Sequence, residues 1–417
     1  MTDLQTFSGW QYLLIDVANH FGLDKELYES RIKWAEIHLD RLEEMAADAP
    51  KKTRPLYIKA VQAIRGAQQG KATGHLVGFD AVCSGMQIMS VLTGCIKSAT
   101  ATGLIEMNQR SDAYTEVTNE MGNLMGNQFV VDRDDIKQGV MTSLYGSKEQ
   151  PKKIFGEDTP ELEGFYKAVN NVAPGPSKLL DALLASWQPF TLAHEWRLPD
   201  NHCARIKVME KIEKRLEVDE LGGVKFDYEW YENVGQESGV ANAANVIHSI
   251  DAYLLRTLIR RCNYDRDLIE AADSVIEQIL IERELGVVDA DVPALEGEAL
   301  TLVHRYNESQ MPDISILNYL DHSGYYNLTS AHLRDLARIC QQMLAHAPFP
   351  ILSVHDEFKC HPNNMNHLRR HYRDILKDMA NADMLSDVFS QIYGQQGTYP
   401  KLMPNLADHI VCNYGIN

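Results

Sequence analysis

Two short apolar segments that read as strands lie far apart in the chain, with mainly helical stretches between them. HLVGFD at residues 75–80 ends in Asp80, and PFPILSVHDEF at residues 348–358 ends in His-Asp-Glu. Strands and helices do not alternate in the regular order of βαβ units, which argues against a doubly wound parallel sheet. The pattern predicts an α+β fold.

Size and composition indicate a globular protein with one large domain and subdomains, or two to three domains. The chain has 417 residues, of which 45% are hydrophobic. No apolar run reaches the roughly 18 to 20 residues that a membrane span needs, and MTDLQTFSGW lacks the basic and apolar regions of a signal peptide. The seven cysteines contain no CxxC pair and are predicted to be free thiols. These features predict a cytoplasmic protein without a membrane partner.

The net charge of −18 argues only weakly against a nucleic-acid enzyme. Neutralisation of phosphates usually shows as a basic patch. An acidic protein can still confine its basic residues to one cleft, while acidic surfaces elsewhere contribute to solubility. The charge therefore leaves the question of nucleic acid open.

A cluster suited to a nucleoside triphosphate lies in the segment RDDIKQGVMTSLYGSK, residues 133–148. Arg133 and Lys137 are four residues apart, so on a helix both cations lie on one face and can neutralise a polyphosphate. Tyr145 follows two turns later and can stack on a base or reach a sugar. The segment predicts a nucleotidyltransferase.

Asp80 and Asp356 sit near the ends of the two predicted strands. If the strands are neighbours, their carboxylates converge and can hold two Mg²⁺ ions, one activating a 3′-hydroxyl and one bridging the triphosphate. Taken alone, either aspartate is more consistent with an ordinary turn or cap residue. Their order in the chain, with the Arg133–Lys137 segment between them, favours the metal site.

Several segments together resemble the single-subunit RNA polymerases of phages and mitochondria, which are related to the family A DNA polymerases. FDAVCSGMQ, RDDIKQGVMTSLYGSK and SVHDEF resemble motifs A, B and C of that family. Similar matches, from about residue 18 to the end, are FGLDKELYESRIKWAE, SDAYTEV, the specificity-like hairpin EWRLPDNHCARIKV, QESGVANAANVIHSIDAYLLR and the C-terminal foot YPKLMPNLADHIVCNYGIN.

The resemblance implies a right-hand polymerase fold, with a palm built on a small antiparallel sheet and mainly α-helical fingers. It also implies that an N-terminal promoter-binding domain is absent. The expected divisions are a helical segment packing on the palm or a partner (1–74), palm with motif A (75–110), fingers with motif B and a hairpin near 194–209 (111–235), a palm helix (236–263), an acidic helical insertion (264–340), and palm with motif C and the foot (341–417).

The family's functional residues transfer to matching positions here. The resemblance implies that Asp80, Asp356 and the Ala81 carbonyl bind metal, and that Arg133, Lys137 and Lys25 contact the triphosphate. It implies that Tyr145 and His248 select ribonucleotides and that Gly146 lets the backbone approach the template base. It further implies that Tyr114 supports the site and that His355 positions Asp356. Lys25 could instead be a surface lysine, His248 a core histidine, Tyr114 a packing residue, and the two cations partners of Asp134 and Asp135.

The implied function is that of the catalytic subunit of a DNA-dependent RNA polymerase in phage transcription, in the cytoplasm of a bacterial host. It would use two Mg²⁺ ions, ribonucleoside triphosphates and a DNA template to make RNA. Because so little of the chain precedes Asp80, we expect a smaller second subunit, as in split heterodimeric phage enzymes. A single-stranded-DNA-binding protein could deliver the template.

Two departures keep alternatives open. His248 and Asp356 are 356 − 248 = 108 positions apart because of the 264–340 segment. Glu357 makes the HDE form that is usual in family A DNA polymerases. The alternatives are therefore a family A DNA polymerase-like enzyme, or an inactive polymerase-like structural or regulatory subunit. The IHSID segment and the hairpin favour RNA synthesis, and the intact carboxylates and cations favour activity.

Overall fold

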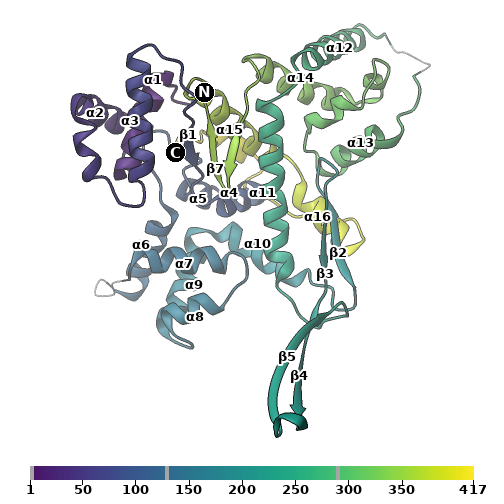
Figure 1. Ribbon diagram of the computed structural model, residues 1–417. Coiled ribbons are helices and arrows are strands. Elements are labelled where there is room, and N and C mark those ends of the chain that lie inside the picture. The colour runs from purple at the N-terminus through teal and green to yellow at the C-terminus, as the bar shows by residue number, and fades with distance from the viewer. Residues whose placement is uncertain (1–3, 127–130, 288–291) are drawn as a thin grey trace.

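Helices dominate the computed structural model, which describes residues 4–126, 131–287 and 292–417. Within these residues the strands form three small antiparallel sheets, one with the order β1-β7-β6 and two hairpins, β2-β3 and β4-β5 (Figure 1). This confirms the α+β prediction, whereas the division into palm and fingers stays a prediction. Among the described helices, none is both long and apolar enough to cross a membrane.

The helices fall into three stretches of the chain. Before β1 come α1 (Gly9–Ala18), α2 (Tyr28–Ile37) and α3 (Arg54–Gln68). Between β1 and the hairpins come α4 (Ser84–Thr93), α5 (Ile96–Ala101), α6 (Ala113–Met125), α7 (Arg133–Ser143), α8 (Glu149–Phe155), α9 (Pro160–Val172) and α10 (Pro174–Ala185). After the hairpins come α11 (Ala241–Cys262), α12 (Arg266–Glu284), α13 (Gly297–Ser309), α14 (Ser330–Leu344), α15 (Met365–Asn381) and α16 (Met384–Tyr393).

Short helical turns connect these elements. They are the π-helical η1 (Asn19–Leu23) and the 3₁₀ turns η2 (Leu39–Arg41), η3 (Glu44–Ala47), η4 (Asp219–Leu221), η5 (Ile314–Asn318), η6 (Gly324–Asn327), η7 (Pro362–Asn364) and η8 (Leu406–His409).

The central sheet joins the two apolar segments that the sequence predicted as strands. β1 (Val77–Asp80) pairs with β7 (Glu357–Cys360), which pairs in turn with β6 (Leu352–Val354). The second segment is therefore not one strand ending in His-Asp-Glu, as predicted. It turns back at His355 and Asp356, and His355 takes the left-handed backbone conformation with φ 55° that this two-residue turn requires.

The two faces of the central sheet differ in polarity. Phe79 and Phe358, which are cross-strand partners, are buried in the core. The next pair along the strands is Asp80 and Glu357, and their side chains point to the opposite, open face. The alternation of the strand therefore holds the acids in the open and the aromatic rings in the core.

A buried arginine ties the two ends of the chain to α15. Arg369 is 1% exposed and donates hydrogen bonds to the carbonyl oxygens of Gln5 and Asn413, both at 2.8 Å, and to the Tyr12 hydroxyl at 3.1 Å. Its guanidinium also lies 5.0 Å from the ring centre of Tyr28. These contacts use both terminal nitrogens of the guanidinium, while its Nε has no partner in the described chain, and they join the N- and C-terminal segments to α15.

The segment predicted as an acidic insertion folds around its own apolar cluster. Residues of α12, α13, α14 and the turns η5 and η6 form this cluster, and Ile276, Leu302 and Leu336 are among its buried members. Arg283 fastens α12 to the η6 turn by donating to the carbonyl oxygens of Tyr326 (2.8 Å) and Leu328 (2.9 Å). The helical unit extends to Leu344, and its role as an insertion stays a prediction.

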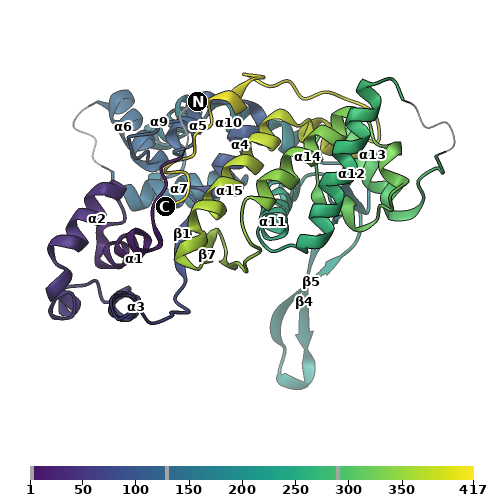
Figure 2. The same cartoon turned by 90° about the horizontal axis from the view of Figure 1, so that it is seen from above.

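The longest hairpin in the described chain is one that the sequence analysis missed. β4 (Glu210–Val218) and β5 (Val224–Glu232) pair in register and project from the body of the molecule (Figures 1 and 2). A signal was present, because the Gly222-Gly223 pair lies between two alternating stretches. The many charges of these strands obscured it.

The shorter hairpin lies where the specificity-like hairpin was expected. β2 (Ala193–Arg197) and β3 (Cys203–Lys207) are joined through Pro199, Asp200 and Asn201. Its side chains hold it on α11, since the Trp196 indole nitrogen donates to the Ser249 hydroxyl at 3.0 Å. The role of this hairpin in specificity stays a prediction.

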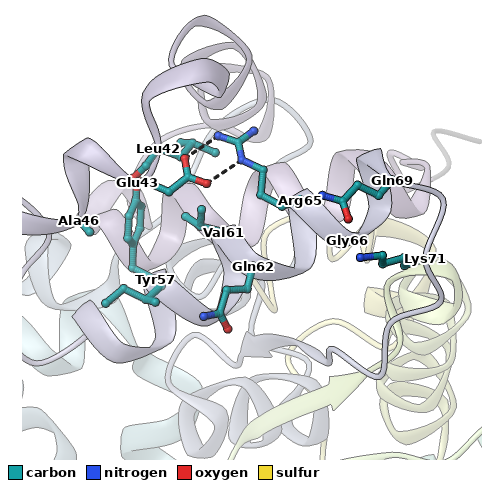
Figure 3. Close-up of a pocket in the computed structure, with 11 residues that line it drawn as sticks. Leu42, Glu43, Ala46, Tyr57, Val61, Gln62, Arg65, Gly66, Gln69 and Lys71 are labelled. Atoms are coloured by element: carbon teal, nitrogen blue, oxygen red, sulfur yellow. Dashed lines mark hydrogen bonds and ion pairs between the residues drawn. The ribbon is translucent and has the colours of Figure 1, made fainter.

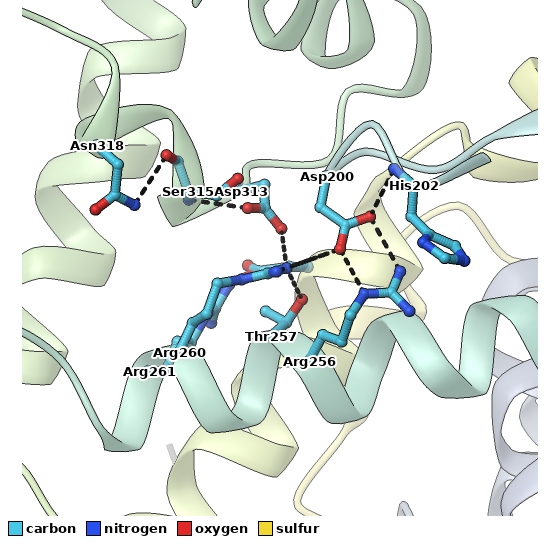
Figure 4. Close-up of polar contacts among 10 residues, drawn as sticks. Asp200, His202, Arg256, Thr257, Arg260, Arg261, Asp313, Ser315 and Asn318 are labelled. Atoms are coloured by element: carbon cyan, nitrogen blue, oxygen red, sulfur yellow. Dashed lines mark hydrogen bonds and ion pairs between the residues drawn. The ribbon is translucent and has the colours of Figure 1, made fainter. Parts of the chain in front are cut away.

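An ion network fixes the turn of this hairpin (Figure 4). Asp200, whose side chain is 4% exposed, accepts hydrogen bonds from Arg256 at 2.7 Å and Arg260 at 3.2 Å. Arg260 also binds Asp313 at 2.9 Å. Burial alone would raise the pKa of Asp200, but the two arginines lower it below its usual value. The network joins the hairpin, α11 and η5.

We predict that Asp200→Ala lowers the free energy of unfolding by about 2 to 3 kcal/mol, because it leaves two partly buried guanidinium groups without their shared carboxylate. Denaturant unfolding followed by circular dichroism measures the change. The control is Asp219→Ala in the exposed η4 turn, which should change stability by about 0.5 kcal/mol or less. Equal effects of the two substitutions would show that the network contributes nothing specific.

Three histidines meet where α15 packs against the loop before β6. His346 and His371 share a hydrogen bond between their Nε2 atoms at 2.7 Å, and the His346 ring centre lies 4.7 Å from that of His367. Burial, the neighbouring His346 and Arg370 lower the pKa of His367 to about 4, and burial lowers that of His371 well below its usual value. The folded cluster is therefore neutral near pH 7.

We predict that this cluster makes the fold sensitive to mild acid. The pKa values are depressed in the folded state, so the unfolded chain binds protons first as the pH falls. The stabilisation is complete above about pH 6.5 and is lost progressively toward pH 4. Unfolding curves at pH 7.5 and 5 test this, and His367→Gln should reduce the loss. Identical pH profiles for the variant and the parent would contradict the assignment.

Candidate functional site

A cavity of about 830 Å³ opens above the acidic face of the central sheet. Eight of the residues predicted for the site line it: Lys25, Asp80, Ala81, Tyr114, Arg133, Lys137, Tyr145 and Asp356. Residues separated by more than 330 positions in the sequence thus meet in one place. Gly146, His248 and His355 were predicted with them but do not line this cavity.

Three carboxylates crowd together at the end of β1 and β7. Asp80 lies directly across from Glu357, and the Ala81 amide donates to the Asp356 carbonyl at 3.1 Å. Asp80 opens onto the cavity, but the surrounding protein and the charges of Asp356 and Glu357 raise its pKa to about 6. Lys137 opposes this shift. The repulsion shows that the site concentrates negative charge that a cation would relieve.

Glu357 belongs to this acidic site, although the sequence analysis treated it only as a clue to the product. A Cβ placed on Gly78 would lie 2.3 Å from the Glu357 Oε1 atom, so the carboxylate extends across that glycine. Lys359 pairs with the same oxygen at 2.9 Å. The lysine partly neutralises Glu357. The other two carboxylates of this site, Asp80 and Asp356, form no ion pair with the residues that the structure describes.

The donors at this site suit a hard divalent cation. Asp80, Asp356 and the Ala81 carbonyl offer oxygen atoms, which Mg²⁺ prefers. In the described part of the chain no three His, Cys, Asp or Glu side chains are arranged as a complete metal site. One or two carboxylates combined with substrate phosphates is the usual way in which Mg²⁺ binds at phosphoryl-transfer sites. The residues present fit that arrangement.

Helix α7 presents the two predicted phosphate-binding cations on one face. Asp132 caps the helix by accepting from the Asp134 amide at 3.0 Å. The Arg133 guanidinium lies 5.4 Å and the Lys137 amine 5.8 Å from the ring centre of Tyr114. Lys137 is exposed and forms no ion pair with the residues that the structure describes. It is a free cation facing the acidic end of the sheet.

Arg133 has a strong partner that the sequence analysis did not identify. Its Nε donates to Asp112 Oδ2 at 2.8 Å, whereas the nearest contact to Asp134 is 3.8 Å. Asp112 also caps α6 by accepting from the Tyr114 amide at 3.0 Å. One carboxylate therefore fixes both the start of α6 and the orientation of Arg133. The available signal was the aspartate at the second position of SDAYTEV, directly before the helical pattern.

The aromatic residues of the site hold distinct positions. Tyr114 is 8% exposed, and Arg133 and Lys137 lie over its ring. It is therefore a packed residue that also contacts both cations of the site. The ring centres of Tyr145 and His248 are 4.8 Å apart. His248 is exposed, which rules out the core-histidine interpretation. A Cβ on Gly85 would lie 2.2 Å from the Tyr145 hydroxyl, so that hydroxyl reaches the start of α4.

The remaining predicted residues have less direct placements. Lys25 is exposed, lines the cavity and has no ion-pair partner among the residues placed in the structure. Gly146 is buried with φ 88°, and a Cβ there would lie 3.2 Å from a Leu184 methyl carbon, so it packs against α10. His355 is exposed in the tight turn before Asp356. The roles predicted for these three residues stay predictions.

Asp251 is a further acid near the site that the sequence analysis passed over. It lies on α11 within the same IHSID segment as His248. Burial, and then the charge of Asp356, raises its pKa to about 6. The shift places Asp251 within electrostatic reach of Asp356. The spacing of three residues after His248, which puts both on one helical face, was the available signal.

Comparison with known proteins supports the family resemblance over the first third of the chain. Residues 5–153 match the family described as DNA-dependent RNA polymerase. The chain is 27% identical over 188 residues to DNA-directed RNA polymerase 1, mitochondrial, of Arabidopsis thaliana, and 24% identical over 188 residues to DNA-directed RNA polymerase 3, chloroplastic, of Nicotiana sylvestris. It is 28% identical over 167 residues to a probable DNA-directed RNA polymerase of Neurospora crassa.

These alignments are partial on both sides. They cover 36% of this chain and 19% of the length of each plant protein, and 34% and 18% for the fungal protein. The matched family segment contains Lys25, Asp80, Tyr114, Arg133 and Tyr145. The second half of the acidic site, at Asp356, lies beyond it and is brought to it by the fold.

Proposed function

We propose that this chain is the catalytic subunit of a DNA-dependent RNA polymerase, which transfers ribonucleotides on a DNA template. The observation that carries the proposal is the cavity in which Asp80 and Asp356 face the cations of α7. The acids lie on one side of the cavity and the cations on the other. This arrangement suits a reaction between a hydroxyl, activated near the acids, and a triphosphate bound by the cations. The similarity of residues 5–153 to RNA polymerases supports the same function.

Asp80, Asp356 and the Ala81 carbonyl would hold Mg²⁺, two ions in the two-metal scheme. When bound, the metal would activate the 3′-hydroxyl of the growing RNA and neutralise phosphate charge. The electrostatic argument is the raised pKa of Asp80, which results first from burial and then from the nearby charges of Asp356 and Glu357. Glu357 is already paired with Lys359, so it would add to the negative electrostatic potential at the site without binding the metal directly.

The cations of the site bind and orient the triphosphate. Lys137 and Lys25 are unpaired within the described residues and can meet phosphate oxygens without first breaking an ion pair. Arg133 is held by Asp112, so its guanidinium is oriented in advance and its remaining N–H groups are available. Preorganised charge of this kind stabilises the transition state without reorganisation during the reaction.

The sugar would be selected by Tyr145 and His248. Their rings are in contact, and the Tyr145 hydroxyl reaches the first turn of α4 beside β1. A phenolic oxygen at that point can sense whether the sugar carries a 2′-hydroxyl, and the exposed His248 can contact the same group. Asp251 lies three residues after His248 on α11, so it is on the same side of that helix.

A smaller second subunit would complete the enzyme, as in a split phage polymerase. Exposed apolar side chains in the first 80 residues support a docking surface, with Ile37 68%, Leu56 42% and Ile58 42% exposed. The net charge of −18 favours a basic partner. Within this proposal the sheet and α11 form the palm, α6 to α10 the fingers, and a single-stranded-DNA-binding protein supplies template.

A family A DNA polymerase-like activity is the alternative that one observation favours. Glu357 follows the catalytic aspartate and lies on the floor of the cavity. Primer extension on a single-stranded template, with ribonucleotides in one reaction and deoxynucleotides in another, separates the two functions. The chain should be assayed alone and with any subunit that co-purifies. If the chain incorporates deoxynucleotides in preference to ribonucleotides, its proposed function is DNA synthesis and not RNA synthesis.

We predict that Asp356→Asn lowers template-dependent incorporation by at least about 1000-fold, because the site loses a charged metal ligand. The fold and subunit association should be unchanged, which thermal unfolding and size-exclusion chromatography check. Asp219→Asn, in the exposed η4 turn, is the matched control and should remain active. An active Asp356→Asn enzyme would disprove the metal assignment.

We predict that Tyr145→Phe lowers the preference for ribonucleotides over deoxynucleotides by about tenfold, the equivalent of one hydrogen bond of about 1.4 kcal/mol. The ratio of kcat/KM for the two nucleotides measures this. Tyr319→Phe, at a side chain 54% exposed outside the cavity, serves as the control. Unchanged selectivity in Tyr145→Phe would transfer the role to His248 or another group.

A further inference from the structure

A basic stretch free of acidic residues runs through this acidic chain. Residues 51–71, KKTRPLYIKAVQAIRGAQQGK, contain six basic residues, Lys51, Lys52, Arg54, Lys59, Arg65 and Lys71, and no Asp or Glu. The acid-free stretch extends from Ala49 to Phe79. The whole chain has 58 acidic against 40 basic residues, so this segment reverses the local charge. Most of it forms α3.

Two of the six cations have structural partners, and both are arginines. Arg54 donates to the carbonyl oxygens of Ala47 at 2.7 Å and Ala49 at 3.0 Å. Arg65 pairs with Glu43 at 2.6 Å and donates to the Leu39 carbonyl at 2.7 Å (Figure 3). These contacts fasten α3 to the turns before it and explain why arginine stands at these positions.

The four lysines serve no such purpose. Lys51, Lys52, Lys59 and Lys71 are all exposed, and none forms an ion pair with a residue that the structure places. Four unpaired lysines raise the local positive potential without contributing to the fold. Such a surface is suited to a polyanion rather than to an isolated carboxylate.

The positions of these lysines connect the candidate site to a second cavity. Lys52 lines the candidate site together with Pro50 and Thr53. At the other end, Lys71 lines a cavity of about 580 Å³ whose walls include the apolar side chains of Tyr57, Ile58 and Val61 (Figure 3). The lysines before, on and after α3 therefore lead from the proposed catalytic cavity to a recess with an apolar wall, which Glu43, paired with Arg65, also lines.

We infer that this path, Lys51, Lys52, Lys59 and Lys71 on and around α3, binds the sugar-phosphate backbone of single-stranded nucleic acid that enters or leaves the candidate site. Phosphates would contact the lysines, while unpaired bases could turn toward the half-exposed Ile58 and the recess beside it. Continuity with the nucleotide cavity favours nucleic acid over an acidic protein partner. The inference rests on the proposed polymerase function.

The test is the binding of fluorescent single-stranded oligonucleotides, measured by anisotropy at several salt concentrations. The variant carries Lys51→Gln, Lys59→Gln and Lys71→Gln and spares Lys52, which lines the catalytic cavity. We expect weaker binding by the variant. The slope of log Kd against the logarithm of the salt concentration should fall by about 2, because each of the three lost phosphate contacts contributes about 0.7 to that slope. DNA and RNA oligonucleotides of one sequence are compared, to distinguish template from product.

The matched control removes three lysines that already pair with carboxylates: Lys152→Gln, Lys167→Gln and Lys225→Gln. It changes the net charge equally, so unchanged binding by this control together with weaker binding by the α3 variant supports the inference. If the α3 variant and the parent chain bind oligonucleotides equally well, the inference is wrong. It is also wrong if the α3 variant no longer binds an acidic partner protein but still binds nucleic acid as the parent does.

Primer extension by the same proteins separates this inference from the proposed function. If the parent chain incorporates nucleotides and the α3 variant binds oligonucleotides normally, the inference fails and the polymerase function stands. If the parent incorporates nothing while the α3 variant still loses oligonucleotide binding, the surface assignment stands and the proposed function fails.

Discussion

The pairing of β1 with β7 is the constraint on which the rest of the structure depends. It joins residues that are 357 − 80 = 277 positions apart, at the Asp80–Glu357 pair. Phe79 and Phe358 lock the register from the buried face, because a slip of one residue would move both rings into solvent and the acids into the core. The intervening helices must leave from and return to these two strands, so this register also decides where α7 can place its cations.

The candidate site is electrostatically unbalanced in a way that a folded core is not. The buried Asp200 has two arginine partners that compensate its charge, and the buried Arg369 donates hydrogen bonds to several carbonyl and hydroxyl oxygens. Around the 830 Å³ cavity, by contrast, burial and then the charges of Asp356 and Glu357 raise the pKa of Asp80, and Lys25 and Lys137 have no ion-pair partner in the described residues. Lys137 offsets part of this negative charge, because it lowers the pKa of Asp80, but it forms no ion pair with the residues that the structure describes. The lysines of α3 extend the same imbalance outward from the cavity.

The fold class and eight of the residues that line the cavity could be predicted from sequence, through local patterns and the family resemblance. Helical periodicity places Arg133 and Lys137 on one face wherever the helix lies, and a short apolar run ending in Asp80 predicts a strand end. The features that were missed depend on distant partners or on competing signals. Asp112 gains its role only because α6 and α7 pack so that it reaches Arg133, and Glu357 enters the site only through its register opposite Asp80. The β4-β5 hairpin carries so many charged residues that its alternation was hidden.

The sequence by itself determined the chemical inventory: two aspartates near strand ends, two cations one helical turn apart, and a tyrosine two turns after the second cation. These follow from residue identity and short-range spacing. Only the tertiary structure decided which of them meet. It turned the second apolar segment back at His355, moved Gly146 into packing against α10, and brought Asp251 within electrostatic reach of Asp356. The physical reason is that a contact across hundreds of residues is set by the packing of buried faces, and that packing has no local signature in the chain.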